Sequence, residues 1–262
     1  MLSLPLLKLA IRFGAFMFRY NSPNKPSQRE FYSLNNTHKI PCLGRYKHTG
    51  VYRLKLDFEK HTKVESGYLL IPQPQDGLKE YIDIYDRFCG VIYMLVKVGG
   101  DPDRFIISKE ANDTVHIRAA LSEFVGIEEY IKEIYPNLPK VDYRIYKSSN
   151  PIFHIIKLLR NYNIHLTNST LKQKPMMVKT LIDESQEFEI QVEYISNLSV
   201  SELRRLSSAK DYSDTQLQKM VECFNNEQHE FGVTTLIIKA ALEYSEQIKK
   251  LLILHECKPN YG

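Results

Sequence analysis

The chain has 262 residues, of which 43% are hydrophobic and 25% are charged, and its formal net charge is +4. This composition excludes a disordered or fibrous chain, and the length fits one large domain or a main domain with an appendage. The cysteines are far apart and have no metal-ligand spacing, which argues against a zinc site or a disulfide framework and favours a cytoplasmic protein. They are Cys42, Cys89, Cys223 and Cys257.

The first twenty residues are apolar, but Lys8 and Arg12 interrupt the run before it reaches the roughly 18 to 20 residues that a spanning helix needs. We therefore do not predict a membrane span here, nor a clear secretory signal. The preferred interpretation is a first helix that packs one face on the body of the protein. An organellar presequence or an amphipathic surface helix is the alternative.

Residues 1–75 contain 12 Lys and Arg against 4 Asp and Glu, whereas the remainder contains 23 against 27. Tyrosines and the histidines His38, His48 and His61 alternate with these charges, a composition that can bind phosphates and stack on bases. The alternative is a solvated basic face, or one that docks on the acidic remainder of the chain. We define residues 1–75 as a basic N-terminal extension.

Within this extension, the prolines of residues 21–44 indicate a loop or arm. Residues 51–60 alternate apolar and polar side chains, which predicts a half-buried strand, and residues 67–72 could pair with it. The pattern changes near residue 75, where we place the domain boundary, so that residues 76–262 form a separate helical domain.

Five segments of that domain have the apolar spacing of amphipathic helices. Asp76 is expected to cap the first helix, and Asn150 followed by Pro151 is a start signal for the third. Ser213 and Gln216 predict a capping box for the fourth. The expected helices run from Asp76 to the Gly99-Gly100 pair and over residues 112–135, 150–166, 216–229 and 234–254.

Residues 176–195 break the helical period, since apolar and acidic side chains alternate from Phe188 to Tyr194. This predicts a small β-hairpin that turns near residues 184–186. The predicted fold is therefore mainly α, a helical bundle with a small β-hairpin insertion and a basic N-terminal extension that contains some strand.

One short motif carries chemistry, the sequence RNYNIH at residues 160–165, at the end of the third predicted helix. It resembles the RxxxxH signature of the HEPN superfamily, with Arg160, Asn161 and His165 at the matching positions. The resemblance covers roughly residues 76–255 and implies a helical bundle with the motif late in one core helix. The alternative is that Arg160 and His165 only cap the carboxyl end of the helix, where cations suit the helix dipole.

The resemblance implies a metal-independent endoribonuclease that produces a 2′,3′-cyclic phosphate and a 5′-hydroxyl, in a toxin or phage-defence role. In such a reaction His165 would transfer protons, Arg160 would bind the scissile phosphate and Asn161 would orient either group. No metal or other cofactor is expected. Two alternatives remain open, a HEPN-like module that binds RNA or a nucleotide without cutting it, and a helical protein-interaction module.

Residues five apart on a helix are rotated by about 140°, so Arg160 and His165 do not share a face unless the last turn is loosened. HEPN proteins are commonly dimers with two motifs in one cleft, which implies a homodimer here. The expected partners are RNA, a second copy of the chain and an antitoxin or regulatory protein, but no membrane.

Several other polar residues are interpreted as structural. His154 is expected to be a packing residue rather than a second proton carrier, and the Gly99-Gly100-Asp101 sequence lacks the spacing of a phosphate-binding loop. Glu123, Glu128 and Glu129 are expected on an exposed helix face.

Overall fold

A computed structural model describes residues 11–12, 54, 56–57, 60–66, 69–100, 107–165, 170–179 and 187–255. The predicted arm at residues 21–44 and the predicted hairpin turn at residues 184–186 lie outside the described residues. Within the described part, no helix has both the length and the apolar character needed to cross a membrane.

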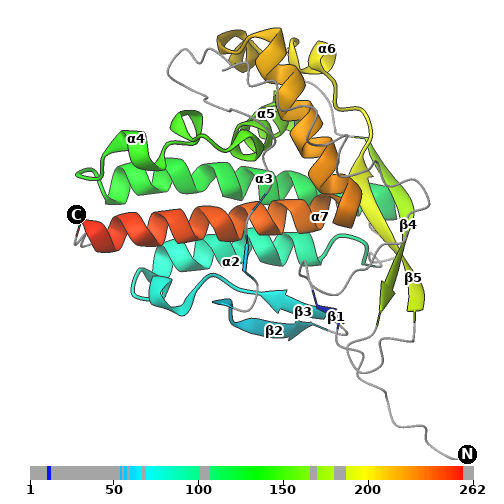
Figure 1. Ribbon diagram of the computed structural model, residues 1–262, viewed down its shortest axis with the longest axis horizontal. Helices are drawn as coiled ribbons and strands as arrows, with labels where there is room; N and C mark the ends of the chain where they lie inside the picture. Colours follow the sequence, from blue (N-terminus) through cyan, green and yellow to red (C-terminus); the bar gives the residue numbers. More distant parts are fainter. Residues whose placement is uncertain are drawn as a thin grey trace, which may run out of the picture.

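The described chain is mainly helical, which confirms the predicted fold class (Figure 1). It also contains a two-stranded sheet, the predicted β-hairpin, and a small three-stranded sheet near the amino terminus. The helices are α2 (Ile82–Val96), α3 (Lys109–Ile134), α4 (Lys140–Tyr143), α5 (Pro151–His165), α6 (Val200–Leu203) and α7 (Asp214–Leu254), with the 3-10 helices η2 (Asp76–Leu78), η3 (Ile145–Lys147) and η4 (Ser207–Asp211). The strands are β1 (Ile11–Arg12), β2 (Lys63–Ser66), β3 (Leu69–Pro72), β4 (Leu171–Lys179) and β5 (Glu187–Ile195).

Helix starts follow the predicted capping signals in two cases and not in a third. Ser213 and Gln216 form the predicted capping box of α7, and the Asn150 side chain accepts a hydrogen bond of 2.8 Å from the Ile152 amide at the start of α5. Asp76, however, does not cap α2. It begins η2, where its carboxylate binds Thr62 at 3.0 Å and Lys79 at 2.7 Å, and α2 starts only at Ile82.

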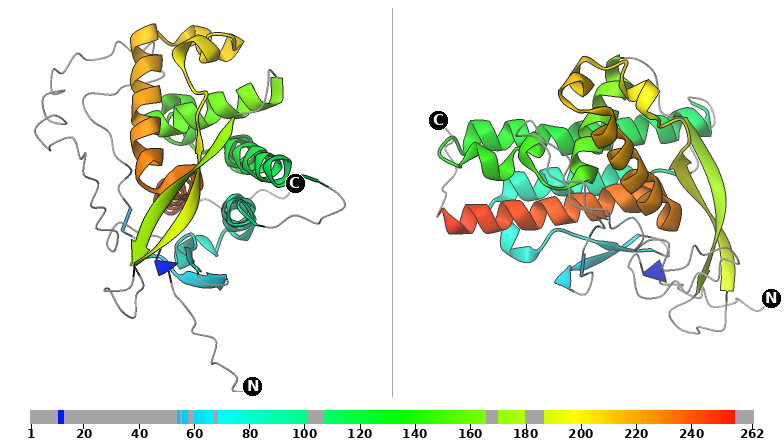
Figure 2. Two further views of the ribbon diagram at one scale, coloured as in Figure 1. Left: turned by 90° about the vertical axis from the view of Figure 1, so that its right-hand side faces the viewer. Right: turned by 45° about the horizontal axis from the view of Figure 1, so that its top comes forward.

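The two predicted carboxyl-terminal helices form one element, α7, that bends sharply at Gly232. Gly232 has a φ of 83°, in the left-handed region that favours glycine. A Cβ atom at this position would lie 2.9 Å from the carbonyl oxygen of Glu193 in β5. The bend therefore allows the β4–β5 hairpin to pack closely on α7 (Figure 2).

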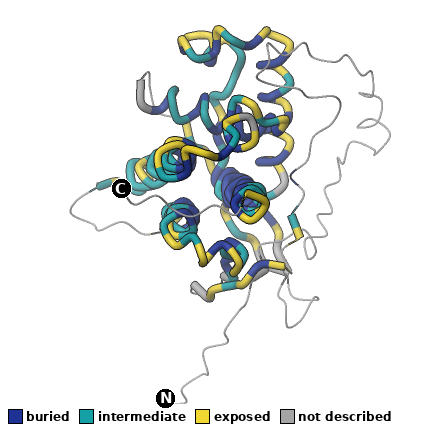
Figure 3. Tube along the Cα trace, turned by 90° about the vertical axis from the view of Figure 1, so that its left-hand side faces the viewer, coloured by how far each residue is buried: buried dark blue, intermediate teal, exposed yellow. Residues whose placement is uncertain are grey.

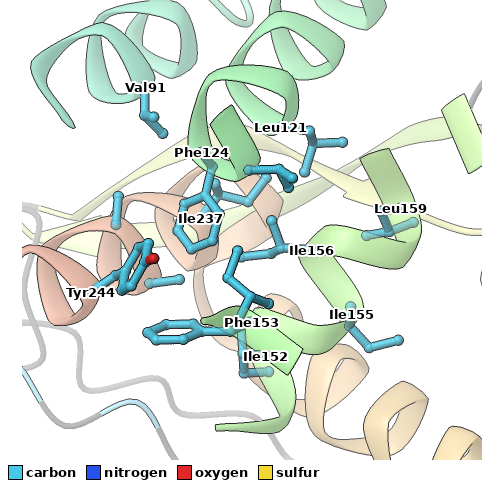
Figure 4. Close-up of a cluster of buried hydrophobic side chains, with 14 of the residues drawn as sticks. Val91, Leu121, Phe124, Ile152, Phe153, Ile155, Ile156, Leu159, Ile237 and Tyr244 are labelled. Carbon is cyan, nitrogen blue, oxygen red and sulfur yellow. The ribbon is translucent and has the colours of Figure 1, made fainter. Parts of the chain in front are cut away.

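The core lies where α2, α3, α5 and α7 meet, and buried residues are concentrated at these contacts (Figure 3). Phe153 of α5 packs against Phe124 of α3 and Tyr244 of α7, with ring centroids 5.7 and 5.2 Å apart (Figure 4). The Tyr244 hydroxyl donates to the Tyr143 carbonyl at 2.8 Å, which satisfies its polar atom inside the core. These contacts bury residues 151–156 at the start of α5 and fix its position.

The sheet near the amino terminus differs from the prediction. Leu54, Leu56 and Asp57 do not belong to a strand, and β3 pairs antiparallel with β2 instead. Only two residues separate β2 from β3, and so short a connection favours a hairpin between them. The free edge of β3 pairs in parallel with Ile11–Arg12, which therefore form a strand rather than part of the expected first helix.

His61, one of the histidines considered for nucleic-acid binding, is 3% exposed and faces the interior. Its Nδ1 lies 2.8 Å from the Gln73 carbonyl and its Nε2 lies 3.1 Å from Glu246 of α7. Leu54 and Ile71 join the same apolar core as the helices. This part of the N-terminal extension is therefore packed against α7.

The β4–β5 hairpin begins earlier than predicted, at Leu171 rather than near residue 176, and its register pairs Leu171 with Ile195. The Gln228 side chain of α7 bonds both the amide and the carbonyl of Ile195, each at 2.9 Å. This pair of bonds takes the place of a neighbouring strand and attaches the hairpin to α7.

Candidate functional site

The predicted motif residues lie on the one polar stripe of a helix that is otherwise buried. Of the α5 side chains that the structure describes, residues 151–163, only Lys157, Arg160 and Asn161 are partly exposed. Residues three and four apart share a helix face, so these side chains form one stripe. The stripe begins at Lys157 because the residues before it pack between α3 and α7 (Figure 4).

The motif arginine and asparagine are joined to Ser208 of η4 by two hydrogen bonds. Arg160 Nη1 donates to Asn161 Oδ1 at 3.1 Å, and Asn161 Nδ2 donates to Ser208 Oγ at 3.1 Å. This arrangement assigns both ends of the Asn161 amide, because the oxygen must accept from the guanidinium. Asn161 therefore orients Arg160 directly.

Arg160 carries an unneutralised charge within the described part of the protein. No described carboxylate lies within 4.0 Å of its guanidinium, and its Nε is buried without a hydrogen-bond acceptor among the described residues. Buried donors normally have a partner, and charged donors lose the most when they lack one. A half-buried guanidinium of this kind is suited to bind an anion such as a phosphate.

His165 is the last residue of α5, and its side chain lies outside the described residues. α5 extends through His165, so the backbone of all three motif residues is helical. The backbone offset between Arg160 and His165 therefore remains about 140°.

A second set of contacts holds α6, which precedes η4 in the chain, against α5. The Tyr162 hydroxyl donates to Glu202 Oε2 at 2.7 Å, and Arg205 Nη1 donates to the same oxygen at 2.7 Å. Burial and the bond to Glu202 raise the pKa of Tyr162, and the bonds from Tyr162 and Arg205 lower the pKa of Glu202. Sequence reasoning did not find Ser208 or Glu202, because no short-range pattern links residues some 40 positions apart.

The acidic residues of α3 do not contact the motif arginine or asparagine. Glu128 is fully buried, contrary to the expected exposed face, and it binds Arg144 at 2.9 Å, Lys157 at 3.1 Å and the Ile145 amide at 2.8 Å. Two cations and an amide compensate the cost of burying this carboxylate. Glu128 thereby fixes η3 and Lys157 in place.

The other acidic residues of α3 form ordinary ion pairs. Glu123 binds Arg87 at 2.8 Å, and Glu129 binds Arg144 at 3.2 Å and Lys132 at 3.4 Å. These pairs are partly or largely exposed to solvent, so they contribute little to stability.

His154 and Gly99 have structural contacts, in line with the interpretation from sequence. His154 is fully buried, with Nε2 at 2.9 Å from the Ser148 carbonyl and Nδ1 at 2.7 Å from the Tyr212 hydroxyl. A carbonyl only accepts, so Nε2 holds a proton. Gly99 has a φ of 83° and donates its amide to Asp113 at 2.8 Å, which ends the turn after α2.

Comparison of the chain with models of protein families, with curated proteins and with solved structures gave no match.

Proposed function

We propose that the protein is a metal-independent endoribonuclease of the HEPN type. The observation that carries the proposal is the position of Arg160 and Asn161, which lie on the only polar stripe among the described side chains of α5. The buried Nε of Arg160 has no acceptor among the described residues, and an anionic ligand would supply one. The Ser208–Asn161–Arg160 chain supports the proposal further, because it preorganises the guanidinium.

In the proposed reaction, the ribose 2′-oxygen attacks the adjacent phosphorus and the bond from phosphorus to the 5′-oxygen breaks. His165 of one subunit takes the 2′-hydroxyl proton, and water protonates the leaving 5′-oxygen. Arg160 binds the two non-bridging oxygens as negative charge builds on them. The products are a 2′,3′-cyclic phosphate and a 5′-hydroxyl, and DNA is resistant because it lacks the 2′-hydroxyl.

The regular end of α5 supports a dimeric site. Because Arg160 and His165 diverge on one helix, a second subunit that presents its own His165 beside Arg160 would complete the site without distorting either helix. The biological role that the resemblance implies is that of a toxin or a phage-defence effector, with an antitoxin or regulatory protein as a partner.

The experiment is incubation of the purified protein with total RNA in EDTA, beside the Arg160→Ala and His165→Ala variants. We expect the wild type to cut RNA and both variants to lose at least about a hundredfold in rate, as expected when a proton carrier or a charge stabiliser is removed. Lys250→Ala, which removes an exposed cation from α7, is the control and should cut normally.

Equal rates in all three proteins would mean that the two motif residues only cap the helix. Binding of RNA by the wild type without any cutting would favour a HEPN-like binding module. Absence of both binding and cutting would favour a helical protein-interaction module.

A further inference from the structure

We propose that Tyr146, with Lys147 and Lys157, forms a nucleotide-binding subsite beside the motif, which stacks one base of single-stranded RNA and holds its phosphate. This inference rests on the proposed function for its substrate class and identifies where the neighbouring nucleotide binds.

The Tyr146 ring is half-buried in η3 and is surrounded by cations. Lys147 Nζ lies 5.4 Å from the ring centroid, Lys157 Nζ lies 5.8 Å from it and Arg144 Cζ also lies 5.8 Å from it. An aromatic ring among cations is the composition with which proteins bind single-stranded nucleic acid, because the ring stacks on a base while the cations bind the backbone.

The cations near Tyr146 outnumber the two carboxylates, Glu128 and Glu129, with which they form ion pairs. Arg144 and Lys157 neutralise the buried Glu128, and Lys132 shares Glu129. Lys147 is exposed and adds its charge to this set. Together with Arg160, the surface attracts a polyanion.

The Tyr146 backbone is held rigidly by its neighbours. The amide of Ile145 donates to Glu128, and the Ile145 side chain is 1% exposed. Arg144, the residue before Ile145, donates to the same carboxylate. A ring carried by a fixed backbone loses little conformational entropy when it binds a base.

The subsite lies next to the motif because Lys157 contacts the Tyr146 ring and lies on the same stripe of α5 as Arg160. Lys157 precedes Arg160 and Asn161 by one turn on the same stripe of α5, which is about 5 Å along the helix axis. A phosphate held by Arg160 and a base stacked on Tyr146 therefore fit adjoining nucleotides of one strand. A duplex would not expose a base face, so the subsite selects unpaired RNA.

The test is fluorescence anisotropy of the full chain with a labelled 2′-O-methyl oligouridine, which cannot be cleaved through a 2′-hydroxyl. Tyr146→Ala should weaken binding about tenfold, as loss of one stacked base does, whereas Tyr146→Phe should stay within about twofold of the wild type. Lys147→Ala should reduce the steepness of the plot of log affinity against log salt concentration by about 0.7, the effect of one lost phosphate contact on a single strand. Tyr93→Ala is the matched control, because Tyr93 is an exposed tyrosine with Lys97 5.1 Å from its ring, on α2.

The proposal is overturned if Tyr146→Ala binds as tightly as the wild type, if Tyr93→Ala weakens binding equally, or if the wild type does not bind the probe. Should Tyr146→Ala unfold, Tyr146→Leu keeps the apolar volume without the aromatic face and should show the same loss. Because the probe is not cleaved, the outcomes are separable. If the protein cuts RNA but its binding of the probe does not depend on Tyr146, only the subsite proposal fails. If the protein binds the probe through Tyr146 but does not cut RNA, only the nuclease proposal fails.

Discussion

Asn161 is constrained at both ends of its amide, and this constraint gives it a definite role in the proposed site. Its oxygen accepts from Arg160 and its nitrogen donates to Ser208. The sequence left open whether Asn161 orients the arginine or the histidine. The described contacts favour the arginine, with Ser208 as the residue that prevents the amide from rotating.

At the residue scale, we predict that Ser208→Ala slows RNA cleavage by about three- to tenfold, the effect of losing one hydrogen bond of about 1 kcal/mol. The loss should appear in the single-turnover rate rather than in RNA affinity, because Ser208 acts through Asn161. Ser207→Ala, a change to the exposed neighbour in η4, should cut at the wild-type rate. A Ser208→Ala variant as fast as Ser207→Ala would contradict the positioning role.

At the scale of elements, Gly232 tests whether the bend in α7 sets the position of the hairpin. Gly232→Ala should destabilise the protein by about 2–4 kcal/mol, because it combines a strained left-handed φ with a Cβ only 2.9 Å from a carbonyl oxygen. Gly90→Ala, in the interior of α2 with its nearest contact at 3.7 Å, should instead stabilise by about 0.5–1 kcal/mol. Urea unfolding measures both, and similar midpoints for the two variants would contradict this account.

The contact of α5 with α6 should depend on pH through Glu202. Its pKa lies below the ordinary value of 4.5, so its contribution to stability is present above that pH and is lost as the pH falls through the lowered pKa. Glu202→Gln should therefore be less stable than the wild type at about pH 6. The difference in stability between the two proteins should become smaller below about pH 4. The measurement is the urea midpoint of both proteins over this range, and a constant difference would be the contrary result.

Most elements could be predicted from the sequence because their signals are local. Ser213 and Asn150 cap the helices that begin directly after them. The alternation of side chains before Ile195 likewise indicates a strand at those same residues. The strand expected at residues 51–60 does not form at the described positions 54, 56, 57 and 60, because strand pairing depends on which segment is nearest in space and not on alternation alone. The burial of Glu128 was also missed, since its compensating partners come from η3 and α5, outside any sequence window.

At the scale of the whole molecule, we predict a homodimer that unites the two motifs in one cleft. Solution mass should correspond to two chains of 30.6 kDa. Mixing the inactive Arg160→Ala and His165→Ala variants under conditions of subunit exchange should restore about a quarter of wild-type activity, because about half of the dimers are mixed and each has one intact site. A monomeric mass, or no activity in the mixture, would contradict a shared site.

In the proposed reaction, the ribose 2′-hydroxyl attacks the phosphate at the site formed by Arg160 and His165. Its most direct test compares an all-ribose oligonucleotide with the same oligonucleotide carrying one 2′-deoxy residue at the mapped cut, both in EDTA, with mass analysis of the ends. We predict that the first is cut to a 2′,3′-cyclic phosphate and a 5′-hydroxyl, that the second is not cut at that position, and that His165→Ala cuts neither. Cutting at the deoxy position, or 5′-phosphate products, would contradict it.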